Sequence, residues 1–156
     1  GLHVARENDV AIVPGVFGRG IAWLERYQKK EVKELKNGRH KKPRQPWKRH
    51  ADNLDAFVFM VLVEAGKSND AMLEFLYEDR NHLSLYAKSM YGIALHRLES
   101  NEKLAMIMRN IEQHLVEEDE KQTAYLEMPG HQGYWWYWYG SEYEAHAYYL
   151  KLLSLF

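Results

Sequence analysis

Three segments of the chain are apolar on nearly every side of a helix, and this pattern most constrains the fold. They are residues 54–66 (LDAFVFMVLVEAG), 86–98 (YAKSMYGIALHRL) and 141–153 (SEYEAHAYYLKLL). Each starts at or just after a polar residue that can cap a helix, namely Asp52, Ser84 and Ser141. A helix that is apolar all round has to be covered by neighbours on every side. We therefore predict that these three helices pack against one another at the centre of the protein.

Amphipathic segments alternate with the apolar ones. Apolar residues recur with helical period over residues 14–36, where Pro14 can occupy the first turn, and again over 69–79 and 101–116. Such helices bury one face and expose the other. Apolar helices shielded by amphipathic ones form the repeating hairpins of a two-layered helical ring. The expected fold is therefore all-α, a partial α/α toroid of about three helical hairpins, formed by residues 1–156 as a single domain.

Two other segments interrupt the helices. The stretches on either side of PGHQG, residues 122–128 and 134–139, alternate in polarity, which predicts a β-hairpin over 122–139 inserted before the last helix. Seven Lys or Arg and no acidic residue lie from Lys36 to Arg49. Because this stretch also contains glycine and two prolines, we interpret residues 37–51 as a solvated basic loop and not as a nucleic-acid site.

Composition excludes several classes of function. The longest apolar run, residues 56–63, is far shorter than the roughly 20 residues of a membrane span. The absence of cysteine rules out disulfides, thiolate zinc sites and a cysteine nucleophile within these residues. Glu142 and His146 are spaced as two ligands on one helical face, but no third ligand accompanies them. We expect no metal, no cofactor, no nucleic acid and no membrane span.

The predicted hairpin carries six consecutive aromatic residues. Alternate side chains of a strand point to opposite faces, so two sets of three rings are expected. The sets are Tyr134, Trp136 and Trp138 on one face and Trp135, Tyr137 and Tyr139 on the other. One set can pack on the helices while the other forms a contact surface for another domain or a ligand. The alternative is that both faces belong to the core.

The three apolar helices resemble the later inner helices of the thioester domain in alpha-2-macroglobulins and complement components. The resemblance is strongest in EAHAYYL, residues 144–150, and in AFV beginning at Ala56. The stretch YWWYWYGSE before the last helix is similar to the large bacterial members. The resemblance implies the C-terminal half of an α/α toroid within a periplasmic or extracellular protease trap, an endopeptidase inhibitor with a defence role. Its partners would be other domains of the parent protein and, through the parent, target proteases.

The resemblance also assigns roles to individual residues. The reactive motif of the family contains a cysteine and a glutamine, and this chain has neither that motif nor any cysteine. The chain is therefore expected to be a scaffold and domain-contact surface, not an enzyme. His40 and His50 lie where some members carry a histidine that assists acyl transfer, with ordinary loop histidines as the alternative. Ser141 and Glu144 match a helix-capping motif. Half a toroid would leave inner-helix surface uncovered, which predicts self-association.

A second class of function uses the same architecture. Helical toroids also form carbohydrate-active enzymes, and exposed Trp and Tyr suit a sugar-binding cleft or module. Such enzymes need paired carboxylates or a metal cluster at the mouth of the ring. Asp52, Asp55 and Glu144 lie at predicted inner-helix starts, although nothing in their spacing pairs them. This alternative predicts hydrolysis or a lyase reaction on a polysaccharide.

Overall fold

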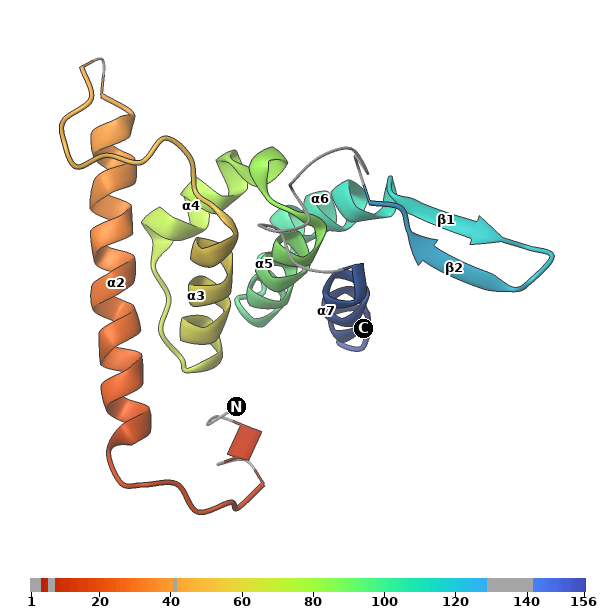
Figure 1. Ribbon diagram of the computed structural model, residues 1–156, viewed down its shortest axis with the longest axis horizontal. Coiled ribbons are helices and arrows are strands. Elements are labelled where there is room, and N and C mark those ends of the chain that lie inside the picture. Colours follow the sequence, from red (N-terminus) through yellow and green to blue (C-terminus); the bar gives the residue numbers. More distant parts are fainter. Residues whose placement is uncertain (1–3, 6–7, 41, 129–141) are drawn as a thin grey trace.

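The computed structural model describes residues 4–5, 8–40, 42–128 and 142–156, and these are mostly helical. Figure 1 shows the helices side by side, with a hairpin projecting from one end of the row. The elements are α2 (Val16–Gly38), α3 (Asn53–Glu64), α4 (Asp70–Glu78), the short 3₁₀ helix η1 (Arg80–His82), α5 (Leu85–Arg97), α6 (Asn101–Glu112), β1 (Leu115–Glu118), β2 (Thr123–Leu126) and α7 (Glu142–Leu153). The predicted all-α class with one β-hairpin before the last helix is confirmed.

The three apolar helices lie next to one another. Helix α5 packs against α3 on one side and α7 on the other, while α2 and α4 pack on α3 and α6 packs on α5. Every residue of α5 from Ala87 to Leu95 is buried. Its Gly92 permits close packing, because a Cβ there would meet Leu152 of α7 at 2.7 Å and Ile107 of α6 at 3.6 Å. The predicted central row of apolar helices is therefore present.

Local capping explains where these helices begin and end. Asp52 accepts the backbone N–H groups of Leu54 and Asp55, and the Asp55 side chain accepts the N–H of Asp52, which completes a capping box at α3. Ser84 accepts the N–H of Ala87 at α5. Gly66, with φ of 77°, follows the end of α3 in the left-handed conformation that glycine adopts readily. These helix boundaries agree with those predicted from the sequence.

The first helix begins later than predicted. Pro14 was expected within its first turn, but α2 starts at Val16 and Gly15 precedes it with φ of 77°. A residue in the left-handed region cannot continue a right-handed helix, so Pro14 lies outside α2. The helix then continues to Gly38, two residues beyond Lys36.

The hairpin has different strands from those predicted. Strand β2 lies within residues 122–128 as expected, but it pairs antiparallel with β1, from Leu115↔Leu126 to Glu118↔Thr123. The last residues of the helix predicted over 101–116 thus lie in a strand, because α6 stops at Glu112. Residues 119–122 make the turn, in which Gln122 has φ of 52°. The pairing sets Leu115 beside Leu126, which is 1% exposed, so these apolar side chains pack against the core. Residues 134–139 lie outside the described part of the chain.

The apolar helices are not equally buried. Helix α5 has neighbours on both sides, whereas α3 and α7 stand at the ends of the central row. Both therefore expose apolar residues: Phe57 of α3 is 40% exposed, and Tyr143 and Leu150 of α7 are 84% and 65% exposed. The expectation that all three helices are enclosed on every side is correct for the middle of α5 and wrong for α3 and α7.

Candidate functional site

The base of the basic loop is not solvated as predicted but contributes a lysine to a cluster of carboxylates. The Nζ atom of Lys48 lies 2.7 Å from Asp55, 2.8 Å from Asp52 and 3.0 Å from Glu31. These acids come from the first turn of α3, its cap and the buried face of α2. The Lys48 N–H also donates to the carbonyl of Glu34. The cluster therefore ties the loop to both helices.

The cluster contains one ammonium group and three carboxylates, and this excess of carboxylates affects the pKa values of its members. Burial raises the pKa of Asp55 to about 6, and the neighbouring charge of Asp52 adds to the effect. Asp55 Oδ2 accepts from Lys48 and from the Asp52 N–H, while buried Oδ1 has no hydrogen-bond partner among the described residues. Burial alone would lower the pKa of Lys48, but Asp55 and Asp52 outweigh it and the pKa is raised. Lys48 therefore stays charged.

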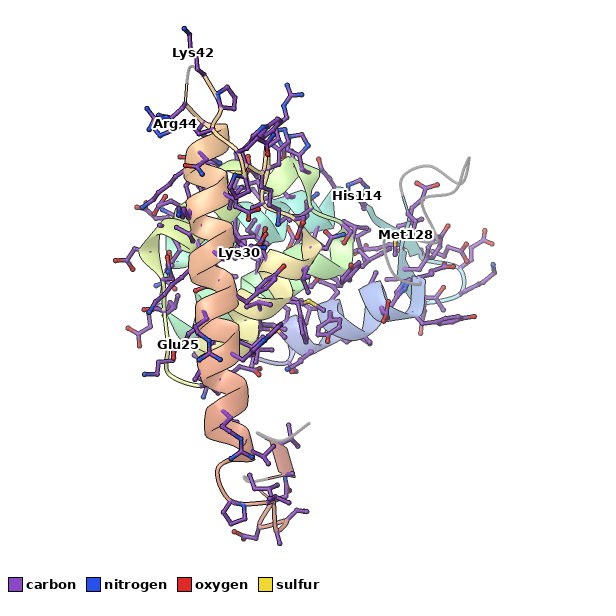
Figure 2. All side chains as sticks on the ribbon, turned by 60° about the vertical axis from the view of Figure 1, so that its left-hand side comes forward. Glu25, Lys30, Lys42, Arg44, His114 and Met128 are labelled. Carbon is purple, nitrogen blue, oxygen red and sulfur yellow. The ribbon has the colours of Figure 1, made fainter. Side chains whose placement is uncertain are left out.

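The tip of the basic loop is exposed to solvent, unlike its base. Lys42 and Arg44 extend from the loop tip beyond the end of α2 (Figure 2) and are exposed. His40 is also exposed. The basic loop is thus solvated at its tip and packed at its base. The sequence could not distinguish these two parts of the loop. The packed Lys48 and the exposed Lys42 and Arg44 lie in the same basic, proline-containing stretch.

His50 lies in a second cluster, formed around a buried aspartate at the end of α4. Its Nδ1 is 3.2 Å from Asp79 Oδ1, and its ring stacks on that of His82 at 3.9 Å between centroids. Asp79 also accepts the Ala51 N–H at 2.8 Å and Arg39 Nη2 at 3.0 Å. A carboxylate that holds one ring nitrogen orients the other, which is the arrangement of histidine general bases. Of the two predicted histidines, His50 lies beside a carboxylate, whereas His40 is exposed.

Sequence reasoning missed Asp79, although a signal was present. Asp79 lies 29 residues after His50 and was assigned only to the end of an amphipathic helix. An acid at a helix C-terminus is unfavourable to the helix dipole, so it needs compensation from elsewhere. The basic segment Arg39–Ala51 provides that compensation through Arg39 and the Ala51 N–H.

Residues at the starts of the apolar helices lie at one end of the row. Burial chiefly raises the pKa of Tyr86 on α5, and the carboxylates of Glu144 and Asp52 raise it further. The carboxylates of Asp52 and Glu144 therefore both act on Tyr86, although Asp52 caps α3 and is paired with Lys48 at 2.8 Å. Asp55 is fully buried and engaged by Lys48, which keeps it away from any substrate. Ser141 lies outside the described residues.

The Glu142 and His146 pair has a structural role. His146 Nε2 accepts the N–H of Leu126 at 2.9 Å, and its Nδ1 lies 2.8 Å from the carbonyl oxygen of Glu142. An accepting Nε2 leaves the ring proton on Nδ1, which can then donate to that carbonyl. Both nitrogens are occupied, and α7 is thereby bound to the hairpin. Within the described ranges, no group of three or more His, Asp or Glu side chains is placed to hold a metal ion.

An exposed apolar surface, here called the α3/α7 surface, occupies the end helices of the central row. It consists of Leu54, Phe57, Tyr143, Leu150 and Leu153. Lys151 of α7 pairs with Glu64 of α3 at 3.1 Å, so these two helices approach each other along one side of α5. The predicted contact surface Tyr134–Tyr139 lies outside the described residues, and sequence reasoning did not assign this role to α3 or α7 residues individually.

Comparisons with protein-family models, curated proteins and solved structures found no match for this chain. Within the described part of the chain, no helix combines the length and apolar character needed to cross a bilayer.

Proposed function

We propose that the chain is the later half of a thioester-type α/α toroid domain in a bacterial alpha-2-macroglobulin-like protease trap. In this proposal it catalyses nothing itself and acts as a scaffold whose exposed surfaces contact other domains of the trap. It works in the periplasm or outside the cell. The observation that carries the proposal is the central row of α3, α5 and α7, flanked by amphipathic helices, with the α3/α7 surface uncovered.

Three features support a scaffold. Helix α5 is buried at every residue from Ala87 to Leu95, so its middle presents no open surface to a substrate. Two ion pairs join loops to helices, namely Lys48 with Asp55 and Arg39 with Asp79. Because these charged groups are paired, they are not available to a substrate. The apolar side chains left outside are large and belong to end helices. Surfaces of this kind mark protein contacts more often than reaction sites.

A trap encloses a protease without blocking its active site, and this distinguishes it from other inhibitors. The native protein that carries this chain should be incubated with a broad-specificity protease and assayed on two substrates. Cleavage of a large folded protein should fall strongly, while cleavage of a short chromogenic peptide should persist. Equal loss of both activities, or loss of neither, would overturn the proposal.

The matched variants test the α3/α7 surface. Phe57→Glu and Leu150→Glu place charges on exposed positions, so the fold should survive while domain contacts weaken. Both variants should protect the large substrate less than the parent protein does. Lys42→Glu at the loop tip is the control, because it lies on a different part of the molecule and should leave protection unchanged.

A carbohydrate-active function is the second candidate, because the carboxylates of Asp52 and Glu144, at the starts of two apolar helices, both raise the pKa of Tyr86. Two carboxylates at the mouth of a helical ring can serve as acid and base on a glycosidic bond. Incubation with a panel of polysaccharides decides between the two candidates. Product formation that disappears in Glu144→Gln would favour the enzyme and defeat the scaffold, whereas no product from any polysaccharide would remove this candidate.

A further inference from the structure

One face of α2 carries a row of basic side chains, here called the basic stripe. Its members, all exposed, are Arg19, Arg26, Lys29, Lys33 and Lys36. They follow one another at intervals of seven, three, four and three residues, which places them along one side of the helix. Val32 and Leu35 are buried and belong to the side of α2 that packs on α3 and α4. At 1.5 Å per residue, the stripe extends over about 25 Å.

The acidic residues of α2 do not neutralise the basic stripe. They pair with lysines outside it, namely Glu25 with Lys67, Glu31 with Lys48 and Glu34 with Lys30. Among the described residues, none of the five stripe side chains forms an ion pair with a carboxylate. The stripe is therefore a continuous set of unneutralised positive charges. A polyanion that binds to such charges releases its counterions, which favours the complex.

Charge is unevenly distributed over the molecule, although the net charge is only −1. The exposed acids Glu117, Asp119 and Glu120 lie on the hairpin, which stands at the opposite end of the row of helices from α2 (Figure 1). Lys42 and Arg44 extend past the end of α2 and add positive charge on that side (Figure 2). The α2 side therefore attracts polyanions despite the net charge. The expectation of no nucleic acid rested on the basic loop and did not take the stripe into account.

An exposed aromatic ring accompanies the charges. Trp23 is 57% exposed and stacks on Tyr27, with 5.7 Å between the ring centroids and 14° between the ring planes. Arg19 lies four residues before Trp23 and Arg26 three residues after it, so both arginines occupy neighbouring positions on the helix surface. A large ring left open to water between two cations suits a ligand that has both negative charge and flat rings.

A second exposed tryptophan lies beyond the other end of the basic stripe. Trp47 is 39% exposed, and it lies against the end of α2, since a Cβ on Gly38 would meet its ring at 3.4 Å. Proteins that bind single-stranded nucleic acid combine these features, because the cations follow the phosphates while the aromatic rings stack on the bases. A duplex offers its phosphates but keeps its bases stacked on one another. The surface of α2 therefore fits a single strand better than a duplex.

We propose that the basic stripe of α2 binds single-stranded nucleic acid without sequence preference. The phosphates lie along the stripe, and a base stacks on the exposed part of the Trp23 ring. Attraction between the stripe and the phosphates supplies affinity that depends on salt. Stacking distinguishes nucleic acid from polyanions that have no bases, and it tolerates any sequence because every base has a flat face.

The test is binding of a fluorescein-labelled oligodeoxythymidylate of about 12 nucleotides, followed by fluorescence anisotropy over a series of salt concentrations. The logarithm of the association constant should fall linearly with the logarithm of the salt concentration. Neutralisation of three to five phosphates of a single strand predicts a slope of roughly −2 to −3.5. A slope near zero, or no binding at about 50 mM salt, would overturn the proposal.

Two pairs of substitutions locate the binding surface. Lys33→Gln combined with Lys36→Gln removes two stripe charges, so it should weaken binding about tenfold and make the slope shallower by about 1.4. Arg109→Gln combined with Lys121→Gln removes the same charge from α6 and the hairpin, and it should change affinity by less than about twofold. All four side chains are exposed, so both variants should keep the fold. Equal weakening by the two pairs would show that net charge decides the binding and would refute the stripe.

The contribution of the bases is tested with Trp23→Ala and with an abasic strand, which carries the same phosphates and no bases. Trp23→Ala should weaken binding of the thymidylate strand at least about fivefold and leave binding of the abasic strand unchanged. If the wild type binds both strands equally, or Trp23→Ala has no effect, the stripe accepts any polyanion, such as a sulfated polysaccharide, and the proposal is wrong. No protease takes part in these measurements, so this proposal and the proposed function can fail separately.

Discussion

At the scale of single residues, Asp55 makes stability depend on pH. Its pKa of about 6 in the folded protein exceeds the ordinary value of 3.8, so the folded state binds this proton more tightly than the unfolded state does. The associated stability is complete below about pH 4 and is lost as the pH rises through about 6. A shift of roughly two pKa units corresponds to at most about 3 kcal/mol.

Urea unfolding of the wild type and Asp55→Asn from pH 4 to 7.5 checks this expectation. The free energy of unfolding of the wild type, minus that of the variant, should fall by up to about 3 kcal/mol across the range. Subtracting the variant removes the titration of other groups. A difference that stays constant with pH would show that Asp55 is ionised as readily in the fold as in the unfolded chain.

Gly38 is a second residue whose identity is dictated by its surroundings. A Cβ atom at this position would overlap the carbonyl oxygen of Lys48, which belongs to the backbone and cannot rotate away. Gly38→Ala should displace the base of the loop, weaken the Lys48 cluster and cost about 1–3 kcal/mol in thermal or urea unfolding. Gly20→Ala in the same helix has open space and should gain up to about 1 kcal/mol. Equal effects of the two changes would contradict the close approach.

At the scale of helices, the contact among α5, α6 and α7 depends on the missing side chain at Gly92. Gly92→Val would push its methyl groups into Leu152 and Ile107, which are both fully buried. We expect a loss of about 1–3 kcal/mol from overpacking, measured by thermal unfolding. Ala105→Val on the exposed face of α6 is the control and should cost about 0.5 kcal/mol from helix propensity alone. If the control costs as much, packing at the seam is loose.

Most of these elements follow from local sequence, and the hairpin shows where local reasoning fails. The caps Asp52, Asn69 and Ser84 and the stop at Gly66 act within one helical turn, so their effects are visible in the sequence. The pairing of Leu115 with Leu126 is not local. By themselves, residues 115–118 are compatible with a helix or a strand. They form a strand because they pair with β2, whose Leu126 N–H also donates to His146.

At the scale of the whole molecule, the α3/α7 surface predicts self-association of the protein. Large apolar side chains exposed on α3 and α7 gain free energy when a second copy covers them. Light scattering coupled to size exclusion should show a mass that rises with protein concentration. Leu150→Glu should remain monomeric at every concentration, because the charge is easily hydrated only while the surface is exposed. A wild-type protein that is monomeric throughout, without binding an apolar dye, would contradict the prediction.

The arrangement of the whole molecule explains which parts of the candidate site could not be predicted from the sequence. Lys48 and His50 were assigned to one solvated loop, yet one enters a carboxylate cluster and the other contacts Asp79. Glu31 lies 17 residues from Lys48, Asp79 lies 29 residues from His50, and Asp52 and Asp55 belong to the start of the next helix, so no periodic pattern links these partners. The apolar surface was expected in general terms, because half a ring leaves inner helices uncovered. Its residues emerge only from the exposure of α3 and α7.

The sequence by itself determined the order of the helices, most of their boundaries and the identity of the apolar row, because capping and periodicity act over a few residues. Tertiary structure alone decided that the middle of α5 is buried while α7 keeps an exposed face, and that residues 119–122 make a turn. It also decided that Lys48 is paired with carboxylates, whereas Lys88 of α5 is buried at 7% exposure. These outcomes depend on which segments become neighbours in space. Burial and charge pairing are properties of that neighbourhood, so two lysines of identical chemistry acquire opposite shifts in pKa.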